Sequence, residues 1–189
     1  RWLFNEGYLP YELVSWFPLP DTPSVPTRVI EVETLQALFH GAIRGNMPIR
    51  DTAMIVLLAD TGPRRSEITH LEVSQIRWLD GGPFGYLFKV LGKAGKLRDV
   101  PFSATAGQVL REWLAVRPGE LSDRNDQRKL FLQPNGQLLT VSGIYQILRR
   151  SASRSGVTME TWNPHSMRHA FAAHYWRVQR DTNIDDPNW

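Results

Sequence analysis

The chain has 189 residues, of which 42% are hydrophobic, and this is enough for one domain with a buried core. It contains no cysteine, which excludes disulfide frameworks and thiolate metal sites and fits a cytosolic protein. The formal net charge is +3, and the longest strongly apolar run, residues 53–59, is too short to cross a bilayer, so we expect no membrane partner.

The first 27 residues differ from the rest because they carry five prolines, which oppose helix and favour an extended linker. We interpret residues 1–27 as the tail of an upstream domain and a linker, and residues 28–189 as a second domain. Because the first residue is Arg1, we expect the chain to be a piece of a longer protein.

Helical periodicity begins after this segment. Leu35, Leu38, Phe39, Ala42 and Ile43 recur on one helix face, which Gly45 can end. Residues 49–60 are apolar nearly all round, as in a central buried helix. The Thr61-Gly62-Pro63 sequence breaks that helix, and a new one can start with Pro63 near its first turn.

The middle of the chain predicts a β-hairpin followed by a helix. Residues 85–90 and 97–102 read as strands, and residues 92–96 form the turn, in which Gly95 can adopt a positive φ. Ser103 can cap the next helix, which residues 118–119, Pro-Gly, close.

The last third is again helical. After a polar loop over residues 122–129, a buried segment over 130–132 and a turn at 134–136, Thr140 can cap a helix that runs to about Ser155. Pro164 introduces a final helix over residues 165–178. The predicted fold class is mainly α with a small antiparallel β-sheet (α+β).

The first candidate functional cluster is the segment 61–67. Arg64 follows a helix-breaking glycine at the start of the next helix, where backbone N–H groups favour anions and a guanidinium can grip two phosphate oxygens. Glu67, three residues later on the same face, can orient Arg64. An ordinary surface salt bridge between the two is the alternative.

The second cluster is the hairpin turn. Lys93 can enter a groove there and donate a proton to a leaving oxygen, and Lys96 is the rival in the same turn. A solvated turn lysine is the alternative.

The third cluster opens the last predicted helix. His165 and Arg168 are three residues apart and project from one face, whereas Met167, Phe171 and Val178 fall on another side and would be core. A zinc site built from the first histidine and His169 is disfavoured, because no glutamate lies between them and no third ligand is evident. Six arginines and one acid occur between residues 140 and 180, which suits a polyanionic partner or an ordinary solvated helix face.

Together and in this order, the three clusters resemble the tyrosine recombinase (phage-integrase) family. That family carries a T-G-x-R-x-x-E box, a hairpin lysine in G-K-x-x-K-x-R, and an H-x-x-R-H box. They stand here as residues 61–67, 92–98 and 165–169, and the resemblance covers about residues 28–178.

The resemblance implies a tyrosine recombinase catalytic domain, preceded by the end of a core-binding domain, that cleaves and rejoins DNA without a metal or other cofactor. Arg64 and Arg168 would clamp the scissile phosphate, His165 would hydrogen-bond it and assist proton transfer, and Lys93 would be the general acid for the 5′-hydroxyl. Glu67 and His169 would support them. We further expect DNA contacts from Arg65, Lys96, Arg98, Arg149 and Arg150.

The family's nucleophile, a tyrosine that forms a 3′-phosphotyrosine link, follows a further L-G-H box after H-x-x-R-H. We recognise neither that box nor the nucleophile here. Tyr175, only two helical turns beyond Arg168, points from its own face, and Trp189 lacks the flanking L-G. The resemblance therefore predicts a fragment that is inactive alone, a tetramer on double-stranded DNA for the full-length protein, and a cytoplasmic, nucleoid-associated location.

Two alternatives stay open at this point. One is a catalytically inactive DNA-binding module of the same fold, although a pure binder needs no aligned catalytic set. The other is a type IB topoisomerase, which shares that set, although the linker and the compact hairpin fit recombinases better.

Overall fold

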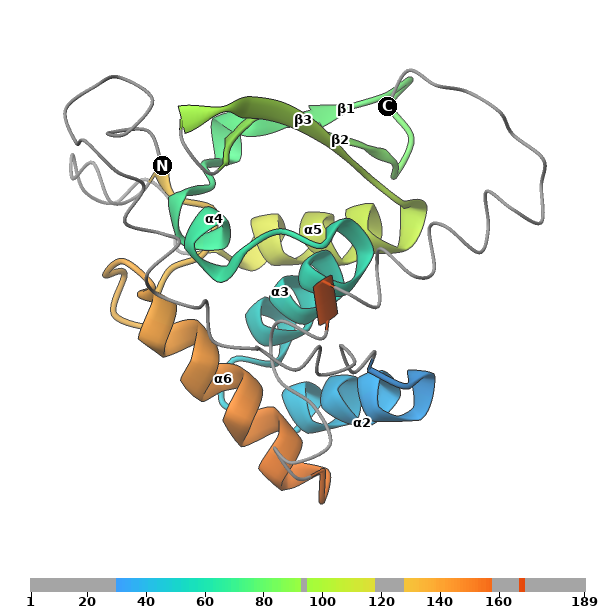
Figure 1. Cartoon of the computed structure of the whole chain (residues 1–189), viewed down its shortest axis with the longest axis vertical. Coiled ribbons are helices and arrows are strands. Elements are labelled where there is room, and N and C mark those ends of the chain that lie inside the picture. Colours follow the sequence, from blue (N-terminus) through green and yellow to red (C-terminus); the bar gives the residue numbers. More distant parts are fainter. Residues whose placement is uncertain (1–29, 93–94, 118–127, 158–166, 169–189) are drawn as a thin grey trace, which may run out of the picture.

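The arrangement of the elements follows the apolar pattern of the sequence. In the computed structural model of the protein, residues 30–92, 95–117, 128–157 and 167–168 are described. A small sheet lies above α5, and α3, α2 and α6 lie below it (Figure 1). In chain order the elements are α2 (Val32–Ile43), α3 (Pro48–Thr61), α4 (Arg65–His70), the short 3-10 helix η2 (Val73–Gln75), β1 (Ile76–Trp78), β2 (Gly85–Leu91), β3 (Leu97–Phe102), α5 (Ala104–Val116) and α6 (Val141–Arg154).

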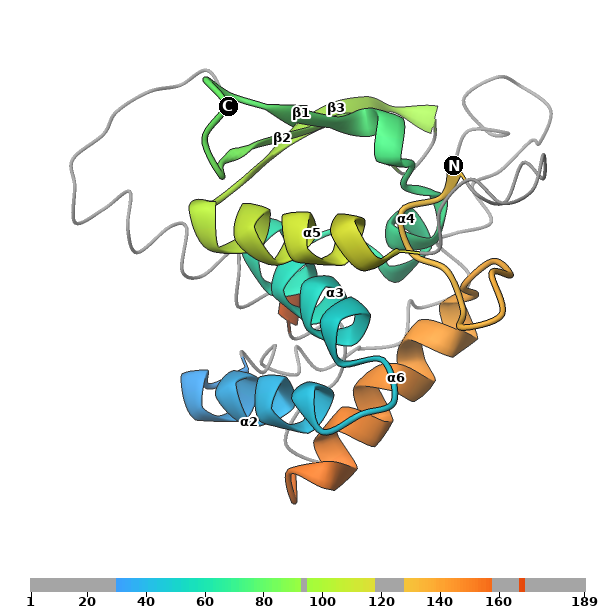
Figure 2. The same ribbon diagram turned by 180° about the vertical axis from the view of Figure 1, so that it is seen from behind.

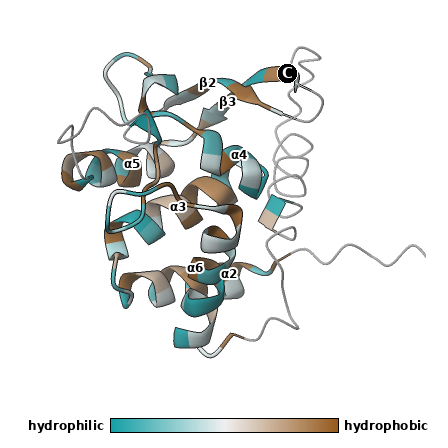
Figure 3. Ribbon diagram, turned by 90° about the vertical axis from the view of Figure 1, so that its left-hand side faces the viewer, coloured by the Kyte–Doolittle hydropathy of each residue, from teal (hydrophilic) through white to brown (hydrophobic). Residues whose placement is uncertain are grey.

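Helix α3 is the centre of the core, as its apolar sequence predicted. It contacts α2 on one side and α5 and β3 on the other, and α5 runs across it in the reverse view (Figure 2). Hydropathy colouring shows the same helix as a mostly brown segment in the middle of the molecule (Figure 3). Its fully or almost fully buried apolar side chains are Ala53, Met54, Ile55, Leu57 and Leu58.

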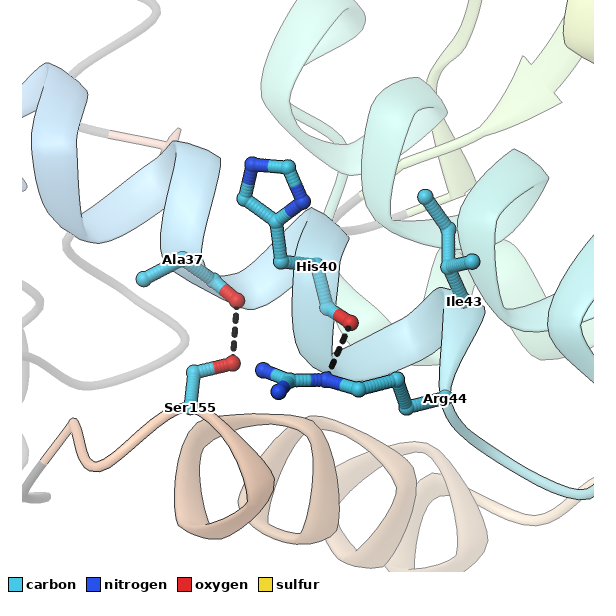
Figure 4. A pocket seen from close by; sticks show the side chains of 5 residues that line it. All are labelled: Ala37, His40, Ile43, Arg44 and Ser155. Atoms are coloured by element: carbon cyan, nitrogen blue, oxygen red, sulfur yellow. Dashed lines mark hydrogen bonds between the residues drawn. The ribbon is translucent and has the colours of Figure 1, made fainter.

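Helices α2 and α6 pack closely enough to exclude a side chain between them. A Cβ added at Gly41 would lie 1.9 Å from the carbonyl oxygen of Ser151, so only glycine fits this crossing. Beside it, the Ser155 hydroxyl donates to the carbonyl of Ala37, and Arg44 Nε donates to the carbonyl of His40 at 3.1 Å (Figure 4). The bond from Ser155 joins the end of α6 to α2, whereas the bond from Arg44 lies within α2 itself.

The sheet has three antiparallel strands in the order β1-β2-β3. The hairpin of β2 and β3 was predicted, but β1 was not, because a strand of three residues gives too short an alternation to recognise. The β2–β3 register shifts between Leu87 and Val90, which marks a bulge. Lys89 occupies it with a φ of 51°, and its backbone N–H donates to Asp99 Oδ1 at 2.8 Å.

The helix ends confirm most of the predicted signals. The Ser103 hydroxyl accepts from Ala106 N at 3.3 Å, and the Thr140 hydroxyl accepts from Gly143 N at 3.0 Å. Gly95 has a φ of 76°, as predicted. Pro63, expected near the first turn of α4, directly precedes the cap residue of that helix.

Some sequence predictions fall on residues outside the described ranges: the linker over 1–27, most of the loop over 122–129, and the final helix except for Met167 and Arg168. Met167 is helical and 1% exposed, which confirms that it belongs to the core. Within the described ranges, no helix combines the length and the apolar character needed to span a membrane.

Candidate active site

The turn between α3 and α4 positions the first arginine. Gly62 ends α3 with φ 56° and ψ 37°, the left-handed conformation that costs other residues about 1–2 kcal/mol, and its N–H donates to the carbonyl of Leu58 at 3.2 Å. Arg64 then adopts an extended backbone as the cap residue of α4. Three residues thus separate α3 from α4, and the Arg64 side chain stays 39% exposed.

Glu67 anchors this arginine twice. Its Oε1 accepts from Arg64 Nη1 at 2.9 Å, and its Oε2 accepts from the Arg64 backbone N–H at 2.8 Å. The Glu67 side chain is only 3% exposed. The predicted pairing is therefore present, with its carboxylate buried and its guanidinium partly exposed.

A second arginine reaches the same carboxylate from the hairpin. Arg98 on β3 donates from Nη2 to Glu67 Oε2 at 2.7 Å and from Nη1 to Oε1 at 3.2 Å. Burial alone would raise the pKa of Glu67, but the hydrogen bonds from Arg98 and Arg64 and the charge of Arg98 outweigh it and lower that pKa. Glu67 is thus held as an anion.

Arg168 enters from the C-terminal part of the chain. Its Nη1 donates to the carbonyl of Gly62 at 2.5 Å, across 106 positions of sequence, and its short helical segment lies beside the end of α3 (Figure 1). Burial lowers the pKa of Arg168, the positive charges of Arg64 and Arg98 lower it further, and Glu67 opposes them. These four groups therefore lie within electrostatic range of one another.

The site that results is strongly suited to an anion. Arg64 and Arg98 contact the carboxylate of Glu67, and Arg168 lies within electrostatic range of it, so the cluster of three guanidinium groups and one carboxylate carries a net charge of +2. Like charges at this spacing repel unless an anion lies between them, and guanidinium groups match the geometry of phosphate oxygens.

The remaining predicted catalytic residues, Lys93, His165 and His169, lie outside the described residues. The chain on either side of the lysine is described: Gly92 N–H donates to the carbonyl of Lys96 at 2.7 Å, which closes the hairpin turn. Lys96 itself is exposed.

The predicted DNA contacts are dispersed over two elements besides the hairpin. Arg65 lies with its guanidinium carbon 5.8 Å from the centre of the Tyr145 ring, a cation–π contact between α4 and α6. Arg149 and Arg150 are exposed on α6. Arg150 also lines a hollow of about 340 Å³ along α6, which the buried Arg50 lines as well.

Sequence reasoning missed the pairing of Arg98 with Glu67, although the strand contained a signal. Side chains two residues apart in a strand share one face, and Arg98 shares its face with Val100 and Phe102, both buried. The alternation therefore aims Arg98 toward the domain body. The contact of Tyr145 with Arg65 had no comparable signal, because it depends on how α4 and α6 pack.

Comparison with known proteins identifies the relationship. The phage integrase family matches residues 28–184. Tyrosine recombinase XerD of Corynebacterium glutamicum is 31% identical over 166 residues, which cover 88% of this chain and 51% of that protein. XerD of Ralstonia nicotianae is 32% identical over 187 residues, covering 97% of this chain and 58% of that protein.

Solved structures agree on the fold. A XerH site-specific recombinase bound to difH substrate in a pre-cleavage complex has a TM-score of 0.65 at 25% identity, over 84% of this chain and 46% of that one. A lambda integrase dimer bound to a COC' core site has a TM-score of 0.64 at 16% identity, over 97% of this chain and 50% of that one.

The fold and the family match define a tyrosine recombinase catalytic domain, and the chain belongs to the phage integrase family. It spans about half the length of the relatives that it matches.

Proposed function

We propose that the chain is the catalytic domain of a site-specific DNA recombinase that cuts and rejoins double-stranded DNA through a 3′-phosphotyrosine intermediate. The observation that carries the proposal is the convergence of Arg64 and Arg168 beside Glu67, from segments about a hundred residues apart. The DNA-bound recombinases among the structural relatives support duplex DNA as the partner.

In the proposed reaction, a tyrosine hydroxyl attacks the scissile phosphorus, the bond from phosphorus to O3′ is kept, and the bond to O5′ breaks. Arg64 and Arg168 stabilise the charge that develops on the non-bridging oxygens. Lys93 gives its proton to the departing O5′, and His165 hydrogen-bonds the phosphate and assists removal of the tyrosine proton. Rejoining is the reverse reaction with a new 5′-hydroxyl, so no external energy source is required.

We assign the nucleophile to none of the five tyrosines in residues 1–189. Tyr86 is half-buried on β2, with its ring 6.5 Å from that of Phe88, and Tyr145 packs against Arg65. We propose that the nucleophile belongs to another part of the full-length protein, which acts on DNA as a tetramer in the compartment that holds the DNA.

Covalent capture tests the proposal without knowledge of the target sequence. The full-length natural protein that contains residues 1–189 is incubated, in EDTA, with nicked duplexes of randomised sequence. Protein-linked DNA is then isolated under denaturing conditions and sequenced, and the modified residue is found by mass spectrometry. The expected result is a 3′-phosphotyrosine at a tyrosine other than the five in this chain.

Substitutions connect the adduct to the site. Arg64→Met and Arg168→Met should each slow adduct formation by about 10²–10³-fold, the usual effect of removing one transition-state contact. Arg44→Met is the matched control, because Arg44 is exposed at the end of α2 and, within the described residues, its side chain hydrogen-bonds only to the carbonyl of His40 on that helix. An adduct at Tyr175 would refute the nucleophile assignment, and tight DNA binding without any adduct would favour the inactive binding module.

A further inference from the structure

We propose that Arg98 is a positioning residue for the strand-transfer site and not a DNA contact. It holds Glu67 from the hairpin side and so sets both the geometry and the net charge that Arg64 and Arg168 present to the phosphate. The proposal rests on the proposed function and gives Arg98 a role different from the one the hairpin motif suggested.

The direction of the Arg98 side chain supports this role. It shares the inward face of β3 with Val100 and Phe102, which are 6% and 4% exposed. Its guanidinium uses two nitrogens on Glu67, at 2.7 and 3.2 Å, which is a bidentate contact. An arginine committed in this way has the donor edge of Nη1 and Nη2 turned toward Glu67, although its side chain stays 36% exposed.

The hydrogen bonding of Glu67 leaves no room for another role of that carboxylate. A carboxylate offers about four acceptor positions, and Glu67 uses four: two for Arg98, one for Arg64 Nη1 and one for the Arg64 backbone N–H. Glu67 therefore cannot serve as a proton acceptor in the site. Its function is to hold the two arginines, and each arginine fixes the carboxylate for the other.

The charge of the cluster depends on Arg98. With Arg98 present, the positive charge of the cluster exceeds the negative charge by two. Without Arg98, the negative charge of Glu67 would offset the charge of one of the two phosphate-clamping arginines, and the cluster would carry a net charge of +1. A phosphodiester is a monoanion that gains a second negative charge in a pentacoordinate transition state, so the site with Arg98 favours the transition state over the ground state.

Gly92 provides an independent geometric sign of this arrangement. A Cβ at Gly92 would lie 2.8 Å from Arg98 Nη1 and 3.8 Å from Glu67 Oε1. The backbone at the start of the hairpin turn thus approaches the ion pair closely enough that a methyl group displaces the guanidinium. Gly92→Ala should therefore weaken the contact of Arg98 with Glu67 while every charged group remains in the chain.

The first arm of the test measures binding. The probe is the duplex recovered by covalent capture, and the full-length protein is titrated at several salt concentrations. If Arg98 contacts a phosphate, Arg98→Met lowers the slope of log K against log salt by about one. The proposal predicts an unchanged slope. Lys96→Met is the matched control from the same hairpin, and its slope should fall by about one.

The second arm measures cleavage in single turnover on the same duplex. Arg98→Met should slow adduct formation by about tenfold to a hundredfold, the effect of one unit charge at this range. Gly92→Ala should also slow it, but by less, because it displaces the Arg98 guanidinium without removing its charge. Removing the charge of Glu67 as well should restore part of the rate of adduct formation. The double variant Arg98→Met/Glu67→Gln should react about tenfold faster than Arg98→Met alone, because the net charge of the cluster returns to +2. A merely structural role of Arg98 would not make a second substitution beneficial.

The outcomes separate this inference from the function on which it rests. Failure of the wild-type protein to form any adduct removes the proposed function and the role of Arg98 with it. A second result is that the wild type forms the adduct while the rate losses of Arg98→Met and Glu67→Gln multiply in the double variant, or while Arg98→Met lowers the salt slope. Either form of this result overturns the role of Arg98 and leaves the proposed function standing. Rescue by Glu67→Gln with an unchanged slope supports it.

Discussion

Glu67→Gln should destabilise the domain far more than its conservative chemistry suggests. The substitution keeps the shape of the side chain but removes the charge that two arginines share, and its amide N–H₂ faces their donors. Glu67 is 4% exposed, so water cannot replace the lost contacts. Breaking a buried pair costs about 3–5 kcal/mol, and because the arginine side chains are 39% and 36% exposed and can turn to solvent, we expect about 2–3 kcal/mol here.

A loss of this size is measurable by denaturant or thermal unfolding. At this chain length it lowers the melting temperature by about 4–12 °C. Glu72→Gln is the control, because within the described residues Glu72 forms an ion pair only with Lys129, at 2.8 Å, besides a longer hydrogen bond from the Ser74 hydroxyl at 3.4 Å, and its side chain is 34% exposed. Such a pair is worth about 0–1 kcal/mol.

The effect of Glu67 should also depend on pH. Because the arginines lower its pKa below the value of about 4.3 in an unfolded chain, its contribution is present above that value and is lost as the pH falls through the lower folded value. The difference between wild type and Glu67→Gln should therefore shrink in acid. A difference below about 0.5 kcal/mol at neutral pH, or one that persists unchanged at low pH, would refute the reasoning.

Substitutions at three further positions test the packing and capping of the elements around the site. Gly41→Ala should cost about 1–3 kcal/mol in urea unfolding, because its Cβ would meet the carbonyl of Ser151 at 1.9 Å, and a near-neutral result would contradict the close crossing of α2 and α6. Trp113→Phe should cost about 1–3 kcal/mol in the same assay, because the indole N–H donates to the Leu130 carbonyl at 2.8 Å in a fully buried place; equal stability would show that this bond is unimportant. Thr140→Ala should cost about 1 kcal/mol and Thr140→Asn almost nothing, as measured by thermal unfolding, and equal losses from both would argue against the cap.

The sequence predicted the elements that have strong local signals. The apolar stretch over residues 49–60, the Gly62 break, and the Ser103 and Thr140 caps all appear where local rules place them. The strand β1 is too short for such a signal and is held by pairing with β2. The bulge at Lys89 depends on the side chain of Asp99, ten residues away, so no local rule reveals it.

The contacts of the candidate site likewise divide into local ones, which the sequence could predict, and distant ones, which it could not. The pairing of Arg64 with Glu67 is local, three residues apart on one helix, and could be predicted. The contact of Arg168 with the Gly62 carbonyl spans 106 positions, so helix periodicity alone could not predict it, and only the resemblance to a family of known architecture suggested that the two segments meet. The link from Arg98 to Glu67 crosses 31 positions and two element types, and it was visible only in the strand alternation.

The account depends most on Arg64 and Arg168 acting on one phosphate, and a double-mutant cycle of cleavage measures this directly. Residues that act as a unit are strongly non-additive. On the captured duplex, the single-turnover rate should therefore fall by similar factors in Arg64→Met, in Arg168→Met and in the double variant. The double variant should then react far faster than it would if the two single losses multiplied. Independent, multiplying losses, or full activity in either single variant, would contradict a shared phosphate site.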